Sequence, residues 1–245
     1  VILFGLNLVF KNYKKRQDRK NAAEKLILEY KLIALKAQVN PHFVSNCLSA
    51  LQNLVIGNQL NKAATYIAKF GLLVRHILNF STRSFITLTE ELEIASLYVE
   101  LEQLRFEHRF EYILDLDNSL NMDKIFVPAL ILNPIVENAI WHGLLPLKAQ
   151  RPAKLIIRVL KKNDNIQLII EDNGVGKKQV SGKVTVKRES KGISLTEQRL
   201  VNTNFLLKND ASSIQCIDLA DESGSPNGTR VIITLPDNLN FVEDE

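Results

Sequence analysis

Hydrophobic residues recur every three or four positions between about residues 21 and 80. Between residues 21 and 40 they form two stripes, which are Ala23, Leu26, Tyr30, Ile33 and Ala37, and Leu28, Leu32, Leu35 and Val39. This spacing predicts helices, and a helix with two apolar stripes needs two packing partners. We therefore expect a helical bundle, formed with a second copy of the chain.

Beyond residue 109 the pattern becomes mixed. Apolar residues alternate at 110, 112, 114 and 116, which predicts a strand, and further strands are expected at 155–160, 166–170, 214–219 and 231–235. Residues 87–90 have the form of a capping box that opens a helix to about residue 107. Residues 128–142 predict another helix, ending at Gly143. The predicted fold class is α+β.

The positive charge is concentrated in one short segment. The chain has 245 residues and a formal net charge of +4, and residues 11–20 hold six basic residues against one acidic residue. The rest of the chain has 25 basic and 26 acidic residues, a net charge of −1. Since nucleic-acid binding requires a broad basic surface, no nucleic-acid partner is expected.

An apolar run, residues 1–10, precedes this basic segment. Its length is half of the roughly 20 residues that a spanning helix needs. We interpret it as the end of a truncated transmembrane helix, with residues 11–20 as its cytoplasmic anchor. The alternative is a short amphipathic or buried segment beside a solvated run of charge. The two cysteines, Cys47 and Cys216, have no metal-binding spacing and are consistent with a reducing cytosol.

Three groups of residues in the second half could carry chemistry. Glu137 and Asn138 are adjacent on the predicted helix, and an Asn oxygen suits Mg²⁺, which shares its ligands with phosphates. Asp172 ends a predicted strand and is followed by two glycines in a glycine- and serine-rich loop, although a plain turn would have the same pattern. Gly192 precedes a predicted helix, as in many phosphate-binding loops or in a simple flexible joint.

The order of these motifs, with Asn-Gly-Thr-Arg-Val at 227–231 on the last strand, resembles the nucleotide-binding domain shared by gyrase, heat-shock chaperone ATPases, histidine kinases and MutL. The resemblance covers about residues 122–238. The phrase Leu-x-Ala-Gln-Val-Asn-Pro-His-Phe at 35–43 resembles the phosphoacceptor segment of LytS-type bacterial sensor histidine kinases. That similarity continues through residues 88–92, Tyr98 and residues 102–106.

The resemblance implies roles in phosphate transfer for three residues. His42 would be the nucleophile, since a neutral imidazole accepts phosphate near pH 7. Asn138 would bind Mg²⁺, and Glu137 would polarise the incoming imidazole or orient water. The cofactors implied are therefore ATP and Mg²⁺.

The resemblance also implies how ATP is held. Asp172 would accept a hydrogen bond from the exocyclic amine of adenine, and Thr229 would support it there. Gly174 and Gly176 would shape the wall of the pocket, and Gly192 would hinge a lid over the triphosphate.

The expected protein is a two-component sensor kinase with an ATP-binding domain built as a two-layer α/β sandwich. The expected parts are 1–10 as the end of a membrane helix, 11–20 as a basic juxtamembrane segment, 21–108 as a helical dimerisation and phosphotransfer region, and 109–240 as the ATP-binding domain. The expected partners are a second copy in a homodimer and a response regulator. The expected location is the inner membrane of a bacterium, with this portion in the cytoplasm.

Three residues depart from the family pattern. Ser45 replaces a Phe, Ser194 replaces the second glycine of the lid motif, and Asn133 replaces a Gln. Serine has less backbone freedom than glycine at position 194. Ser45 and Ser194 therefore leave open a catalytically weak scaffold that signals by dimerisation. Glu137 leaves open a second alternative, a hydrolytic ATPase of the same superfamily.

Overall fold

The computed structural model describes residues 11, 13–14, 41–147, 151–176, 194, 196–201, 204 and 212–237. The chain divides into two compact units, Val1–Leu48 and Ser49–Glu245. Helix α2 (Pro41–Ile56) begins in the first unit. The predictions for residues 1–10 and 21–40, and for most of 11–20, lie outside the described residues. Among the described residues, no helix combines the length and the apolar character needed to cross a membrane.

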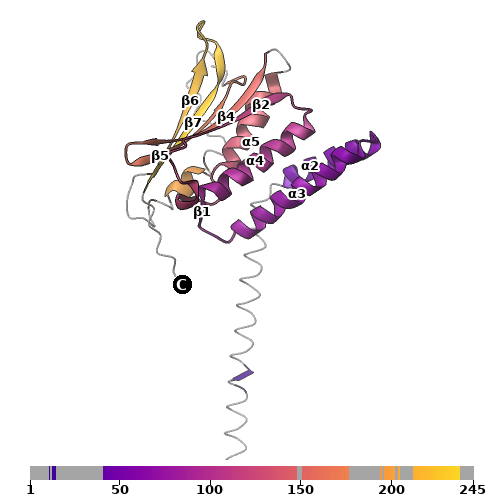
Figure 1. Ribbon diagram of the computed structural model, residues 1–245, viewed down its shortest axis with the longest axis horizontal. Helices are drawn as coiled ribbons and strands as arrows, with labels where there is room; N and C mark the ends of the chain where they lie inside the picture. The colour runs from indigo at the N-terminus through magenta and orange to yellow at the C-terminus, as the bar shows by residue number, and fades with distance from the viewer. Residues whose placement is uncertain are drawn as a thin grey trace, which may run out of the picture. The chain divides into compact units, whose positions relative to one another are not determined.

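Helix α3 (Leu60–Phe80) packs against α4 (Leu88–Arg105) within the second unit (Figure 1). The predicted capping box is confirmed. The Thr87 hydroxyl accepts from the Glu90 N–H at 3.2 Å, and the Glu90 carboxylate accepts from the Thr87 N–H at 2.8 Å. These two bonds satisfy donors that a helix start otherwise leaves without partners, and they fix where α4 begins.

Two short strands flank α4 and were not predicted. β1 (Phe85–Thr87) pairs antiparallel with β3 (Phe126–Pro128), just after the short helix η1 (Met122–Lys124). Three-residue strands are too short to show a recognisable alternation.

The main sheet has five strands in the order β2-β4-β5-β7-β6 (Figure 1). They are β2 (Phe110–Leu116), β4 (Ala153–Lys162), β5 (Asn165–Asp172), β6 (Ser213–Ala220) and β7 (Pro226–Pro236). β2 and β4 are parallel, and the other neighbours are antiparallel. The five predicted strands are therefore confirmed, and four of them are longer than predicted.

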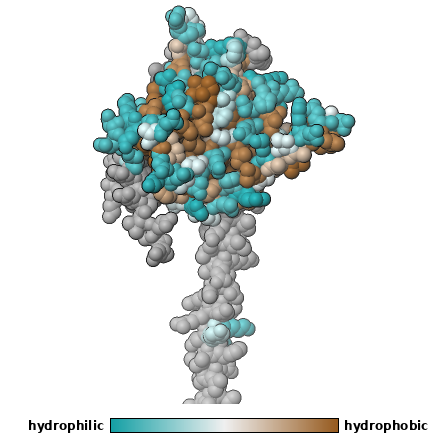
Figure 2. Space-filling view, in the orientation of Figure 1, coloured by the Kyte–Doolittle hydropathy of each residue, from teal (hydrophilic) through white to brown (hydrophobic). Residues whose placement is uncertain are grey.

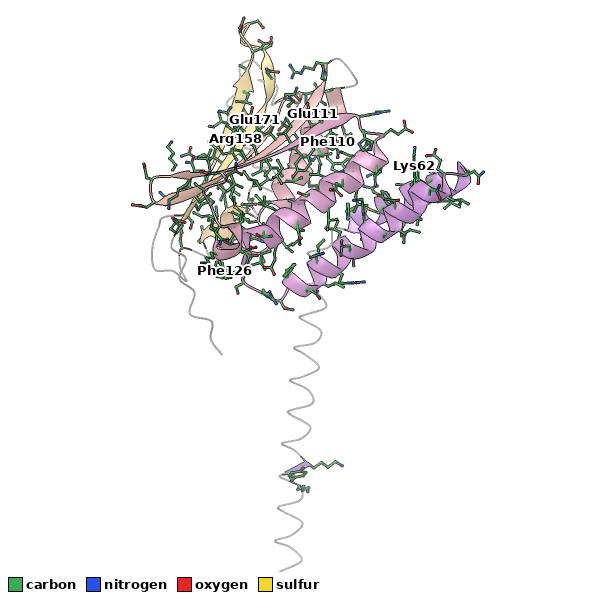
Figure 3. All side chains as sticks on the ribbon, viewed as in Figure 1. Lys62, Phe110, Glu111, Phe126, Arg158 and Glu171 are labelled. Carbon is green, nitrogen blue, oxygen red and sulfur yellow. The ribbon has the colours of Figure 1, made fainter. Side chains whose placement is uncertain are left out.

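The sheet has one apolar and one charged face. In β4 the buried residues alternate, at Ala153, Leu155, Ile157 and Val159, which is the pattern of a sheet covered on one side. The other face carries ion pairs between residues opposite each other on neighbouring strands, and Figure 3 labels members of three such pairs. These pairs are Glu111–Lys154, Asp115–Arg158 and Glu171–Arg230. The predicted α+β class, with a helical part and a two-layer sandwich, is confirmed.

The helix predicted at 128–142 is wrong in its bounds. Pro128 ends strand β3, and helix α5 (Asn133–Asn138) starts only after an irregular turn. The chain then continues as a π-helical segment, η2 (Ala139–Leu144), and a 3-10 turn, η3 (Leu145–Leu147). Gly143 therefore lies inside a helical segment and does not end one, and π-helical turns frequently mark functional sites.

Candidate functional site

A cavity of about 160 Å³ lies within the second unit, where α5 and η2 meet strands β5, β6 and β7. Four of the predicted site residues line it, namely Asn138, Asp172, Gly176 and Thr229. The other lining residues are Ile135, Ala139, His142, Gly143, Ile170, Cys216 and Val231. The fold thus brings together residues from three motifs that are separate in the sequence.

Three glycines allow the backbones around this cavity to approach one another. A Cβ at Gly143 would lie 2.5 Å from Asp172 Oδ1, and a Cβ at Gly174 would lie 2.2 Å from the carbonyl carbon of Gly143. A Cβ at Gly228, which has φ 111°, would lie 1.9 Å from the carbonyl oxygen of Asp172. The Val175 N–H also donates to the Gly143 carbonyl oxygen at 3.0 Å. A side chain at Gly174 or Gly228 would therefore require the backbone to move, and a side chain at Gly143 would require the Asp172 carboxylate to move.

Gly174 and Gly176 differ in how they relate to the cavity. Gly176 lines it and has φ 60°, which favours glycine. Gly174 is buried and is not among the lining residues, and its contact is with Gly143. Its place is therefore behind the cavity wall.

Asp172 is the buried carboxylate of the site, with 4% of its surface exposed. It ends β5, where its Oδ1 accepts from the Gly174 N–H at 2.8 Å. Burial raises the pKa of Asp172 to about 6, although the N–H groups of Gly174 and Thr229 oppose that rise. Above pH 6 the side chain is therefore an ionised acceptor facing a mainly apolar cavity.

The loop that follows Asp172 is held from the start of β4. Arg151 donates to the carbonyl oxygens of Asn173 and Gly174, both at 2.8 Å. The Asn173 side chain accepts from the Lys154 N–H at 2.7 Å and donates to the Pro152 carbonyl at 2.8 Å. These bonds fix the backbone that carries the Asp172 motif.

Glu137 and Asn138 end α5, as predicted for adjacent residues on a helix. Glu137 is not a lining residue, but its charge acts on Glu102, which is buried in α4. Burial raises the pKa of Glu102 to about 7; Arg105 lowers it and Glu137 raises it further. Glu102 Oε2 lies 3.6 Å from Arg105 Nη1, too far for a hydrogen bond.

Aromatic rings surround the guanidinium of Arg105. It lies 4.8 Å from the ring centroid of Phe106 and 4.7 Å from that of Trp141, within the distance of a cation–π interaction. Trp141 belongs to η2 and comes directly before His142, which lines the cavity. The C-terminal end of α4 thus contacts η2, the helical segment that borders the cavity.

Two predicted site residues cannot be related to the cavity. His42 lies in α2, in the first unit, but its side chain is outside the described part. Gly192 also lies outside the described residues. Of the residues that depart from the family pattern, Ser45 is exposed and Ser194 is helical and half-buried.

Similarity to known proteins decides the family. The family model named Histidine kinase matches residues 30–110. Sensor histidine kinase YesM of Bacillus subtilis is 30% identical over 217 residues, 88% of this chain and 35% of that protein. Sensor protein LytS of Oceanobacillus iheyensis is 33% identical, covering 62% of this chain and 25% of that protein. Protein YwpD of Bacillus subtilis is 30% identical, covering 78% of this chain and 71% of that protein. The chain belongs to the LytS-type histidine kinases.

This histidine kinase chain spans about a third or less of the length of YesM and LytS. Catalytic domains of histidine kinases use ATP. The cavity has two features that are common in ligand pockets, one buried carboxylate and mainly apolar walls.

The described residues of this histidine kinase contain no group of three His, Cys, Asp or Glu side chains that could hold a metal ion. Mg²⁺ bound together with phosphates needs only one or two protein oxygens. The side-chain oxygen of Asn138, at the cavity, fits that requirement.

Several residues around the cavity were not singled out in the sequence. Gly143 and Gly228 matter through close approach to residues far along the chain, which no local pattern records. Arg151 stands between two lysines before a strand and gives no signal of its own. Glu102 belongs to a stretch similar to the family, and that similarity alone could have marked it.

Proposed function

We propose that this chain is the phosphoacceptor and ATP-binding part of a sensor histidine kinase. ATP binds in the cavity, its γ-phosphate passes to His42, and the phosphate then passes to an aspartate of a response regulator. The observation that carries the proposal is the convergence of Asn138, Asp172 and Thr229 on one cavity in a chain of this family.

The adenine base would lie at the end of the cavity formed by Asp172. The ionised carboxylate accepts a hydrogen bond from the exocyclic amine of adenine, whereas guanine has a carbonyl at that position and two acceptors would face each other. Ile135, Ile170 and Val231 supply apolar surface for the base. Leaving a buried polar group unpaired costs about 1–3 kcal/mol, so this contact favours ATP over GTP.

The phosphates would lie toward Asn138, whose side-chain oxygen would hold Mg²⁺. When bound, Mg²⁺ neutralises charge on the phosphate oxygens. The unprotonated ring nitrogen of neutral His42 attacks the γ-phosphorus, the bond between the γ-phosphorus and the bridging oxygen breaks, and ADP leaves with that oxygen. The proton on the other ring nitrogen is then released to solvent. Glu137 would polarise the imidazole during this step. Transfer of this kind depends mainly on alignment and electrostatic stabilisation.

We also propose how this chain is arranged. Residues 1–10 are the end of a transmembrane helix, 11–20 a basic juxtamembrane segment, 21–108 the dimerisation and phosphotransfer region, and 109–240 the ATP-binding domain, placed at a bacterial inner membrane. Exposed apolar side chains on α3 support the homodimer. Figure 2 shows that the visible face of the molecule carries apolar as well as polar atoms. These side chains are Leu60, Ile67, Leu72 and Leu78. Leu60, Ile67 and Leu78 recur at helical spacing on one side of α3, and exposed apolar side chains gathered on one face are typical of protein interfaces.

Labelling with γ-³²P-ATP and Mg²⁺ tests the proposal. The wild-type chain should acquire acid-labile, base-stable label, and His42→Gln should acquire none. Asp172→Asn should lose label through weaker ATP binding, while Asp115→Asn, a change on the charged face of the sheet, should label normally. Equal labelling of wild type and His42→Gln refutes the kinase. ATP hydrolysis that survives loss of His42 would indicate the hydrolytic ATPase instead, and absence of ATP binding would indicate the scaffold.

A further inference from the structure

The turn that leads into α5 is held by two opposite charges from distant parts of the chain. Glu91 on α4 is fully buried, and its two carboxylate oxygens accept from the N–H groups of Leu130 and Leu132, each at 2.7 Å. Arg199 donates to the carbonyl oxygens of Ala129, at 2.7 Å, and of Leu130. One carboxylate and one guanidinium therefore bind four backbone groups of the same turn.

This turn, residues 129–132, needs such support. Leu130 has φ 59°, a left-handed conformation that costs an ordinary side chain roughly 1–2 kcal/mol. Leu132 is the N-cap of α5, where it makes no side-chain cap, and its carbonyl accepts from the N–H groups of Ile135 and Val136 at 3.0 Å. By binding the Leu132 N–H, Glu91 fixes where α5 begins.

The position of that start matters because α5 is the first part of a longer helical stretch. It has six residues, Asn138 is the last of them, and the chain continues without a break into η2. The turn before Asn133 therefore sets where the helical stretch that carries Asn138 begins. The helical residues 196–201 are also tied to the turn, since Thr196 Oγ1 lies 3.4 Å from the Ile131 carbonyl oxygen in addition to the bonds of Arg199.

We propose that Glu91 and Arg199 are positioning residues of the nucleotide site, which hold turn 129–132 and thereby place the Asn138 amide for Mg²⁺ bound to nucleotide phosphates. The inference rests on the proposed function and deepens it. Burial raises the pKa of Glu91 to about 7, and Arg199 and the N–H groups of the turn oppose that rise. Burial lowers the pKa of Arg199, and Glu91 opposes that change. Each charge thus stabilises the other in a buried place.

Calorimetric titration of the 245-residue chain with ATP, with and without Mg²⁺, tests this role. Glu91→Gln keeps one acceptor but loses the charge and the second acceptor, so the gain in ATP affinity from Mg²⁺ should fall by about tenfold. Adenosine has no phosphates, so its affinity should stay close to that of wild type. Glu93→Gln, which removes another carboxylate from α4, should change neither quantity.

Arg199 provides a second pair of variants. Arg199→Leu should also reduce the gain from Mg²⁺, whereas Arg199→Lys keeps a cation and should retain part of it. Thermal unfolding shows which variants are folded, and the Arg199 pair carries the test if Glu91→Gln does not fold. Autophosphorylation is not the readout, so failure of wild type to label His42 would refute the proposed function without deciding this inference.

Three results would overturn the inference. The first is an undiminished gain from Mg²⁺ in folded Glu91→Gln or Arg199→Leu. The second is a loss of adenosine affinity as large as the loss of the gain in ATP affinity from Mg²⁺, because a general disturbance of the fold would weaken both. The third is a wild-type chain whose ATP affinity does not depend on Mg²⁺.

Discussion

Gly143→Ala is the sharpest test of how the site is built. The new Cβ would lie 2.5 Å from Asp172 Oδ1 and 2.9 Å from its Cγ, closer than non-bonded atoms approach. The Asp172 side chain has little room to move, because it is buried and its Oδ1 accepts a hydrogen bond from the Gly174 N–H. The substitution should therefore turn the carboxylate away from the position in which it accepts from adenine.

The size of the effect follows from the bond that is lost. A hydrogen bond to a charged group contributes about 1.5–3 kcal/mol. Because about 1.4 kcal/mol corresponds to a tenfold change in affinity, Gly143→Ala should weaken ATP binding roughly 10- to 100-fold. Overpacking should also lower the stability of the chain by about 1–3 kcal/mol.

Gly71→Ala is the matched control. Gly71 lies in α3, and a Cβ there would meet no atom within 4 Å. Alanine in a helix interior is more stable than glycine by about 0.5–1 kcal/mol, so this variant should unfold at a higher temperature and bind ATP normally. Calorimetric titration with ATP and thermal unfolding measure both quantities for each variant.

A third variant shows whether the effect runs through Asp172. If it does, the double variant Gly143→Ala with Asp172→Asn should bind ATP no more weakly than the weaker of the two single variants. The reasoning is refuted if Gly143→Ala binds ATP with an affinity within about twofold of wild type, because losing one hydrogen bond to a charged group normally weakens binding by more than that.

Three further predictions concern pH and stability. Protonation of Asp172, whose pKa is about 6, should weaken adenosine binding as the pH falls from 7 to 5, and titrations with constant affinity over that range would contradict it. Burial raises the pKa of Glu102 from 4.5 to about 7, so the folded state holds an extra proton between these values and loses stability as the pH rises through them. The free energy of unfolding of wild type should therefore fall by on the order of 3 kcal/mol more between pH 5 and pH 8 than that of Glu102→Gln, and urea unfolding at the two pH values measures both. Thr87→Ala should cost about 1 kcal/mol by removing the cap of α4, whereas Thr87→Ser should retain most of it; equal unfolding midpoints for the two would contradict this role.

Local signals in the sequence predicted the parts of the fold that depend on neighbouring residues. Alternation marked the strand at 110–116 and runs of β-forming residues marked the other four, while the capping box marked the start of α4 because its two bonds join residues three apart. The residues that follow Asp172 were also found, because a strand that ends in a carboxylate and glycines is a local pattern.

Long-range contacts explain what could not be predicted. Periodicity suggested a helix from residue 128, but Glu91 binds the backbone of Leu130 and Leu132, about 40 residues away, and holds an irregular turn there. The glycine at 143 was expected to end a helix, yet its role depends on Asp172, on a different strand. No property of the residues next to these positions records such contacts.

The position of Cys216 makes it a natural labelling site for following nucleotide binding. Cys216 lines the cavity and is exposed, whereas Cys47, the other cysteine, is buried. A thiol-reactive dye should therefore label the native chain mainly at the cavity, without engineered cysteines. The rate of that labelling then becomes an optical measure of nucleotide occupancy, which can be followed in mixtures where calorimetry is impractical.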